Sequence, residues 1–96
     1  MILRSIRLIL KDYAQHMTGS SVVVVLKILL EIFESENLEL NTTVTALTHR
    51  YLLSMPCISL AIQTASDLGI FDVDKGSSLR AYTVITINKD FFDDNI

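Results

Sequence analysis

Hydrophobic residues at the start of the chain recur at helical spacing and leave a separate line of basic residues. Arg4, Arg7 and Lys11 form that line. The apolar positions of the other face are Ile2, Ile6, Ile9, Leu10, Tyr13 and Met17. This spacing predicts an amphipathic helix over residues 2–17. We interpret the basic line as a solvated face, and the alternatives are a dimerisation helix or a contact to phosphates.

The next segment, residues 21–36, is apolar on most sides. Consecutive valines favour a strand, whereas the length of the segment and the spacing of Lys27, Glu31 and Glu34 favour a helix. We predict a helix, with Gly19 ending the helix before it and a following serine capping it. So apolar a helix in a small protein needs cover from the first helix or from a second subunit.

Residues 37–41 are predicted to form a loop that leads into two helices joined by a tight turn. The first helix covers residues 43–52 and begins at an asparagine or threonine cap. Its inward positions are Val44, Leu47 and Tyr51. Ser54 caps the second helix, and Gly69 ends it in the left-handed conformation. The inward positions of the second helix are Ile58, Ala61, Ile62, Ala65 and Leu68.

Two short strands are predicted to follow. Residues 71–73 form the first, residues 74–78 have turn composition, and residues 79–87 form a second strand rich in β-branched and aromatic side chains. Phe91 and Phe92 stand in an acidic tail, where they close the core or contact a partner. The pattern as a whole predicts an α+β fold.

Composition narrows the class of protein. The chain has 96 residues, half of them hydrophobic, a net charge of −3 and one cysteine. This predicts a single domain, 1–96, and the acidic balance counts against nucleic acid unless basic residues cluster. A lone cysteine gives no disulfide framework or paired metal ligands and suits a reducing cytoplasm, where we place the protein. Charges interrupt every apolar run, so no signal peptide and no membrane span are expected.

Residues 43–87 resemble the winged helix-turn-helix transcription regulators. The positions that carry the resemblance are Val44, Leu47, Tyr51, Ser54, Ile58, Ile62, Leu68, Gly69 and Ile70. The resemblance implies a three-helix core with a β-hairpin wing, here with an extra N-terminal amphipathic helix. Residues 43–69 would be the helix-turn-helix and residues 70–88 the wing, while residues 1–19 would serve dimerisation.

The resemblance also implies a surface that contacts double-stranded DNA. Its candidate residues are Arg50, Ser54, Pro56, Ser59, Leu60, Gln63, Thr64, Lys75 and Arg80. Gln63 would pair with adenine and Leu60 with a thymine methyl group, while the basic residues would contact the backbone. The chain departs from the family in one respect, because its second motif helix has no lysine or arginine and carries Asp67.

No other chemistry stands out in the sequence. The serines suit caps and turns, the glycines stand at breaks, and His16 and His49 lack nearby metal ligands, so we expect no enzyme, cofactor or metal site. Cys57, near the start of the second motif helix, is interpreted as a small hydrophobe, with a redox sensor as the alternative.

The predicted function is therefore sequence-specific DNA binding by a dimeric, repressor-like regulator. The homodimer would form through the helices from Ile2 to Met17 and from Val22 to Phe33, and two motif helices would then favour a palindromic site. The alternative is a winged-helix adaptor or inhibitor that binds a protein instead of DNA, which the base-free helix and an outward Leu60 favour. A structural subunit of a larger assembly is a third possibility.

Overall fold

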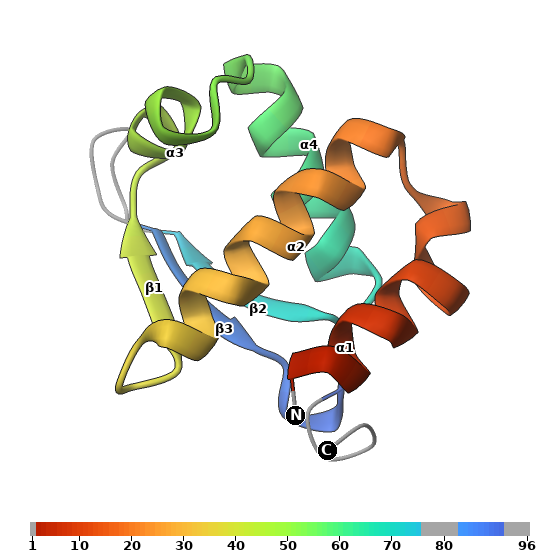
Figure 1. The fold of residues 1–96 in the computed structure, drawn as a ribbon. Helices are drawn as coiled ribbons and strands as arrows, with labels where there is room; N and C mark the ends of the chain where they lie inside the picture. The colour runs from red at the N-terminus through yellow and green to blue at the C-terminus, as the bar shows by residue number, and fades with distance from the viewer. Residues whose placement is uncertain (1, 76–82, 92–96) are drawn as a thin grey trace.

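The computed structural model describes residues 2–75 and 83–91, which fold into helices packed on a small antiparallel sheet (Figure 1). The chain is an α+β protein, as the sequence pattern predicts. The first predicted helix is helical over most of its length but changes type along the way. It begins as α1 (Ile2–Leu8), continues as the π-helical turn η1 (Ile9–Tyr13) and ends as the 3₁₀ turn η2 (Ala14–His16).

The buried face of this first helix is narrower than predicted. Ile9 is fully buried, and Tyr13 and Met17 pack against the core, but Leu10 is half exposed. The prediction for Leu10 was therefore wrong, because the π-helical turn departs from the 3.6-residue repeat on which the predicted face was drawn. The basic residues Arg4 and Arg7 are exposed, as a solvated face requires.

Helix α2 (Gly19–Glu34) confirms the choice of helix over strand. Its N-cap differs from the prediction. The hydroxyl of Thr18 accepts a hydrogen bond from the Ser21 amide at 3.2 Å, so Thr18 is the N-cap. Gly19 therefore begins this helix and does not end the previous one. Thr18 serves because its hydroxyl satisfies an amide that has no partner in the first turn. The buried side of α2 consists of Ser21, Val24, Val25, Ile28, Leu29 and Ile32.

A strand replaces the loop that was predicted before the helix-turn-helix. Strand β1 (Glu39–Thr42) pairs antiparallel with β3 (Thr83–Ile87), and β2 (Phe71–Lys75) pairs with the other side of β3. The predicted two-stranded wing is therefore part of a three-stranded sheet in the order β1-β3-β2. Residues 74 and 75, predicted as the start of the turn, extend β2 instead, because they pair with β3. The rest of the predicted turn, the start of the second predicted strand (residues 79–82) and Phe92 lie outside the described residues.

The core lies between the sheet and the helices that cover it. Figure 1 shows α2 crossing one face of the sheet, with α4 beside it. Ile28 and Leu29 of α2 meet Ile85 of β3 and Phe71 of β2 in one buried cluster. The Tyr13 ring packs edge-on against Phe91, with ring centres 5.9 Å apart, so that the end of the chain is held to the first helix.

Candidate nucleic-acid interface

Two helices and a short turn form the candidate interface. Helix α3 (Val44–Tyr51) starts at Thr43, whose hydroxyl accepts the amide of Ala46 at 3.0 Å. Helix α4 (Met55–Asp67) starts at Ser54, whose hydroxyl accepts the amide of Cys57 at 3.3 Å. Both caps satisfy an amide of the first turn, so they fix the residue at which each helix begins. The predicted caps, turn and first-turn proline are confirmed.

The ends of these helices are fixed by two residues with positive φ. Leu52 ends α3 with φ 57° and donates its amide to the Thr48 carbonyl at 3.0 Å. Gly69 follows α4 with φ 77°, as predicted. Glycine adopts this region without strain, whereas a leucine there brings its Cβ close to its own carbonyl. The backbone of Leu52 is therefore strained. The residue is 87% exposed, so packing of its side chain does not compensate for this strain.

The outer face of α4 carries most of the predicted contact residues. Its inner face is buried through Ile58 and Ala61, which leaves the opposite side of the helix facing outward. The exposed predicted residues on this side are Pro56, Ser59, Leu60 and Gln63. Thr64 is half-buried, at the edge of this face. The Gln63 amide donates a hydrogen bond to the Asp67 carboxylate at 2.9 Å, one helical turn away.

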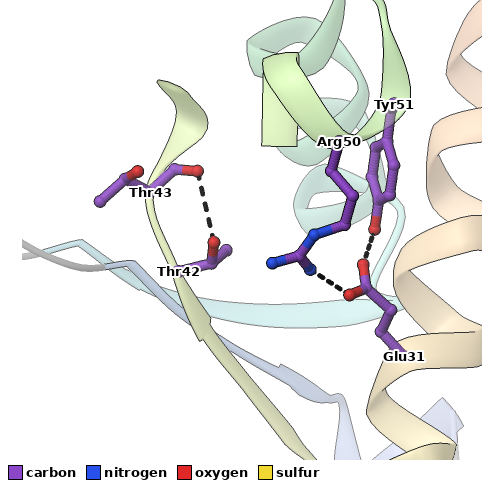
Figure 2. A network of polar contacts seen from close by, with 5 residues as sticks. All are labelled: Glu31, Thr42, Thr43, Arg50 and Tyr51. Carbon is purple, nitrogen blue, oxygen red and sulfur yellow. Dashed lines mark hydrogen bonds and ion pairs between the residues drawn. The ribbon is translucent and has the colours of Figure 1, made fainter. Parts of the chain in front are cut away.

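Arg50 is directed toward helix α2. Its guanidinium forms an ion pair with Glu31, and the same carboxylate accepts a hydrogen bond from the Tyr51 hydroxyl. Figure 2 shows both side chains reaching from α3 to Glu31, while Thr42 and Thr43 lie where β1 passes into α3. The Lys27 ammonium lies 5.3 Å from the centre of the Tyr51 ring, close enough for a cation–π contact.

This group of residues, the α2–α3 network, joins Arg50 and the Tyr51 hydroxyl to one carboxylate, with Lys27 over the Tyr51 ring. Burial raises the pKa of Tyr51 well above its ordinary value, and the hydrogen bond to Glu31 and its negative charge raise it further. Tyr51 therefore stays protonated as a donor to Glu31. The network holds α3 against α2. It also pairs Arg50, the basic residue nearest to the turn, with a carboxylate.

The sequence pattern could not reveal this network. Glu31 was interpreted as part of a solvated stripe and Arg50 as a phosphate contact, and the two lie 19 positions apart in the chain. Only the packing of α3 on α2 brings them together. Of the basic residues predicted for the wing, Lys75 is the last residue of β2, and Arg80 lies outside the described residues.

An apolar surface at the start of α4 was only partly foreseen. Leu60 is 52% exposed, as predicted, and Leu52 and Met55, which precede it in the chain, are exposed as well. Helix α4 has no basic residue over Met55–Asp67. The outer face therefore combines small polar groups with apolar groups and has little positive charge.

The remaining chemical candidates are modest. Within the described residues no cluster of histidine, cysteine and acidic side chains could hold a metal ion. Cys57 is a free, half-buried cysteine in the first turn of α4. Across residues 2–75 and 83–91, no helix combines the length and the apolar character that crossing a membrane requires. Comparisons of the chain with family models, curated proteins and solved structures found no match.

Proposed function

We propose that the chain is a winged helix-turn-helix protein that binds double-stranded DNA and regulates transcription, most simply by occupying a promoter. The observation that carries the proposal is the order of the elements. Helix α2 is followed by β1, by α3 and α4 around a short turn, and by β2 and β3, with β1 and β2 on either side of β3. In a helix-turn-helix, this arrangement holds the second helix where its outer face can enter the major groove.

The outer face of α4 suits readout of base edges better than attraction to phosphates. Gln63 has an amide that can form two hydrogen bonds with adenine once it leaves Asp67, and Ser59 can donate to a base or a phosphate. Leu60 can contact a thymine methyl group. Positive charge would come from Arg50 beside the turn, from Lys75 at the end of β2, and from Arg80, which the resemblance assigns to the wing. Arg50 keeps half of its side chain exposed while it is paired with Glu31.

The first test is a fluorescence-anisotropy titration of the protein with random-sequence duplex DNA at about 50 mM and about 200 mM salt. The proposal expects binding at the lower salt that weakens as salt rises. The slope should be shallow, since it is about 0.9 per phosphate contacted and the interface has few basic residues. An absence of binding at the lower salt would contradict the proposal.

Substitutions then separate base readout from backbone contact. Gln63→Ala should relax the preference at one base pair, by about 1–3 kcal/mol. Lys75→Ala and Arg80→Ala should weaken binding to all sequences alike and reduce the salt slope by about 1 each. Lys11→Ala, which removes an equal charge from an exposed position in η1, is the matched control. Equal losses from all these changes would point to non-specific attraction by net charge.

A protein partner in place of DNA is the second candidate, favoured by one specific observation. Leu52 is almost fully exposed and has a strained backbone, and Met55 and Leu60 are exposed nearby in the sequence. Strain that is kept at an exposed apolar residue is typical of a contact surface. On this candidate, Leu60→Asp abolishes a purified partner complex while Gln63→Ala leaves it intact, and the chain shows no affinity for duplex DNA at low salt.

A further inference from the structure

Arg50 stands beside the candidate interface but is held by a carboxylate of its own chain. It lies in the last turn of α3, four residues before the Ser54 cap of α4. Its guanidinium is paired with Glu31 of α2, as Figure 2 shows. The Arg50 side chain is nevertheless 49% exposed, against 24% for Glu31. The ion pair therefore lies at the boundary with water, where an anion from solution can approach the guanidinium.

A carboxylate and a phosphate compete for the same donors of an arginine. A guanidinium binds either anion through its planar N–H groups, often two at a time. Glu31 accepts a hydrogen bond from the Nη1 group of Arg50. Its negative charge also cancels much of the attraction that Arg50 exerts on another anion nearby. A DNA phosphate that approaches Arg50 therefore competes with Glu31.

Glu31 would keep other partners if Arg50 moved away. Tyr51 donates its hydroxyl hydrogen to the second oxygen, Oε2, of the Glu31 carboxylate. Lys27 lies four positions before Glu31 on α2, the spacing at which side chains of a helix meet, and its ammonium is 5.3 Å from the centre of the Tyr51 ring. A lysine that precedes a glutamate at this spacing forms the weaker orientation of such a pair, so Arg50 is the preferred partner when no other anion competes. The network thus contains a replacement cation for Glu31.

We propose that Glu31 regulates DNA binding by exchanging its partner. In the free chain Glu31 holds Arg50, and on a duplex a phosphate takes the guanidinium while Lys27 pairs with Glu31. This inference rests on the proposed function, because the competing anion is a phosphate of DNA. The exchange makes the free chain a weaker binder of anions than its basic residues alone would make it. It also gives α2, which lies outside the two motif helices, control over the affinity for DNA.

Glu31→Gln removes the competing charge and keeps the size of the side chain and an acceptor for Tyr51. In the anisotropy titration with duplex DNA at about 50 mM salt, this variant should bind about two- to fivefold more tightly than the wild type, the factor expected from the loss of one partly exposed ion pair. Glu34→Gln is the matched control, since it removes an exposed acid one turn along α2 that forms no ion pair with a described residue. The gain from Glu34→Gln should be smaller. Circular dichroism checks that both variants are folded.

Arg50→Ala shows whether the released guanidinium reaches the DNA. If a phosphate displaces Glu31, Arg50 contacts DNA in the wild type and in Glu31→Gln alike, so Arg50→Ala should reduce the salt slope by about 0.9 in both backgrounds. Without Arg50, the gain from Glu31→Gln should fall to that of Glu34→Gln. A slope that Arg50→Ala reduces only in the presence of Glu31→Gln would show that Glu31 never releases Arg50, and would overturn the exchange.

Lys27→Met tests the replacement cation, because it removes the ammonium and keeps a side chain of similar length. It should weaken DNA binding more than Lys11→Met, which removes an equal charge from an exposed position in η1. In the Glu31→Gln background the two changes should have equal effects, since no carboxylate then needs a new partner. Equal losses in the wild type would overturn the exchange of partners.

The outcomes separate this inference from the proposed function. Binding that Glu31→Gln strengthens beyond the control, and that Arg50→Ala weakens with a shallower salt slope, is the expected result. Duplex binding by the wild type, with Glu31→Gln no tighter than Glu34→Gln, would overturn the inference and leave the proposal of DNA binding in place. An absence of binding by both the wild type and Glu31→Gln would overturn the proposal of DNA binding, and this inference with it.

Discussion

Tyr51→Phe tests whether the α2–α3 network contributes to stability. The change removes one hydroxyl and keeps the ring, which lies below Lys27 and is 8% exposed. The lost interaction is the hydrogen bond that Tyr51 donates to the Glu31 carboxylate. Because the acceptor is charged, such a bond contributes roughly 1.5–3 kcal/mol.

The expected loss lies toward the lower end of that range. Glu31 keeps its ion pair with Arg50, and about a quarter of its side chain is exposed, so water can replace part of the lost bond. We therefore expect the free energy of unfolding at neutral pH to fall by about 1–2 kcal/mol. In urea denaturation of a chain of this size, with a slope of about 1 kcal/mol per molar, the midpoint should fall by about 1–2 M. Tyr13→Phe, which removes a hydroxyl with no hydrogen bond to any described residue, is the control.

The effect of Tyr51→Phe on stability should also depend on pH. The pKa of Tyr51 is raised in the folded state, so the folded chain binds this proton more tightly than the unfolded chain. The resulting stabilisation is fully present below the ordinary tyrosine pKa of about 10 and is lost as the pH rises above it, by up to about 1.4 kcal/mol per pH unit. The difference in stability between the wild type and Tyr51→Phe should therefore shrink above pH 10. A midpoint unchanged by Tyr51→Phe, or a difference that stays constant with pH, would refute the network as described.

Other substitutions test the core and the local backbone by thermal or urea denaturation. Ile28→Ala should lower the free energy of unfolding by about 2–5 kcal/mol, because Ile28 is fully buried where α2 packs on the rest of the core. A loss below about 1 kcal/mol would contradict that packing. Leu52→Gly should raise the free energy of unfolding by about 0.5–1 kcal/mol, since glycine adopts a φ of 57° without strain. Tyr13→Phe, which does not alter the backbone at residue 52, serves as the control. Ser5→Ala should be neutral or stabilising by about 1 kcal/mol, because the buried Ser5 hydroxyl has no hydrogen-bond partner among the described residues; a clear loss would reveal one.

The helices could be predicted from the sequence because local rules decide them. Ser54 and Gly69 have the capping hydroxyl and the left-handed conformation that helix ends favour, and both act as predicted; Thr43 is the one of the predicted alternatives that caps α3. The buried faces of α3 and α4 followed equally from the repeat of apolar positions. The prediction that Gly19 ends the first helix was wrong, because the preceding Thr18 caps α2 and Gly19 is the first residue of that helix.

The strand β1 and the α2–α3 network could not be predicted, because both depend on contacts between distant parts of the chain. Residues 39–42 have no strong strand preference, and they become a strand only because the edge of β3 offers unpaired backbone groups. Glu31 and Arg50 likewise show no local sign of pairing. For the candidate interface, the outward residues of α4 could be predicted from the sequence, but the ion pair between Arg50 and Glu31 could not.

The division of α2 into three sides makes the roles of its residues separable by experiment. Ile28 lies on the core side, Glu31 on the side toward α3, and Leu30 on the outward side, so three neighbouring residues point in different directions. Substitutions without shared partners have nearly additive effects on stability. Ile28→Ala should therefore lower stability, whereas Leu30→Glu should have little effect on the stability of the fold. A Leu30→Glu variant that unfolds as readily as Ile28→Ala would show that this side of α2 belongs to the core.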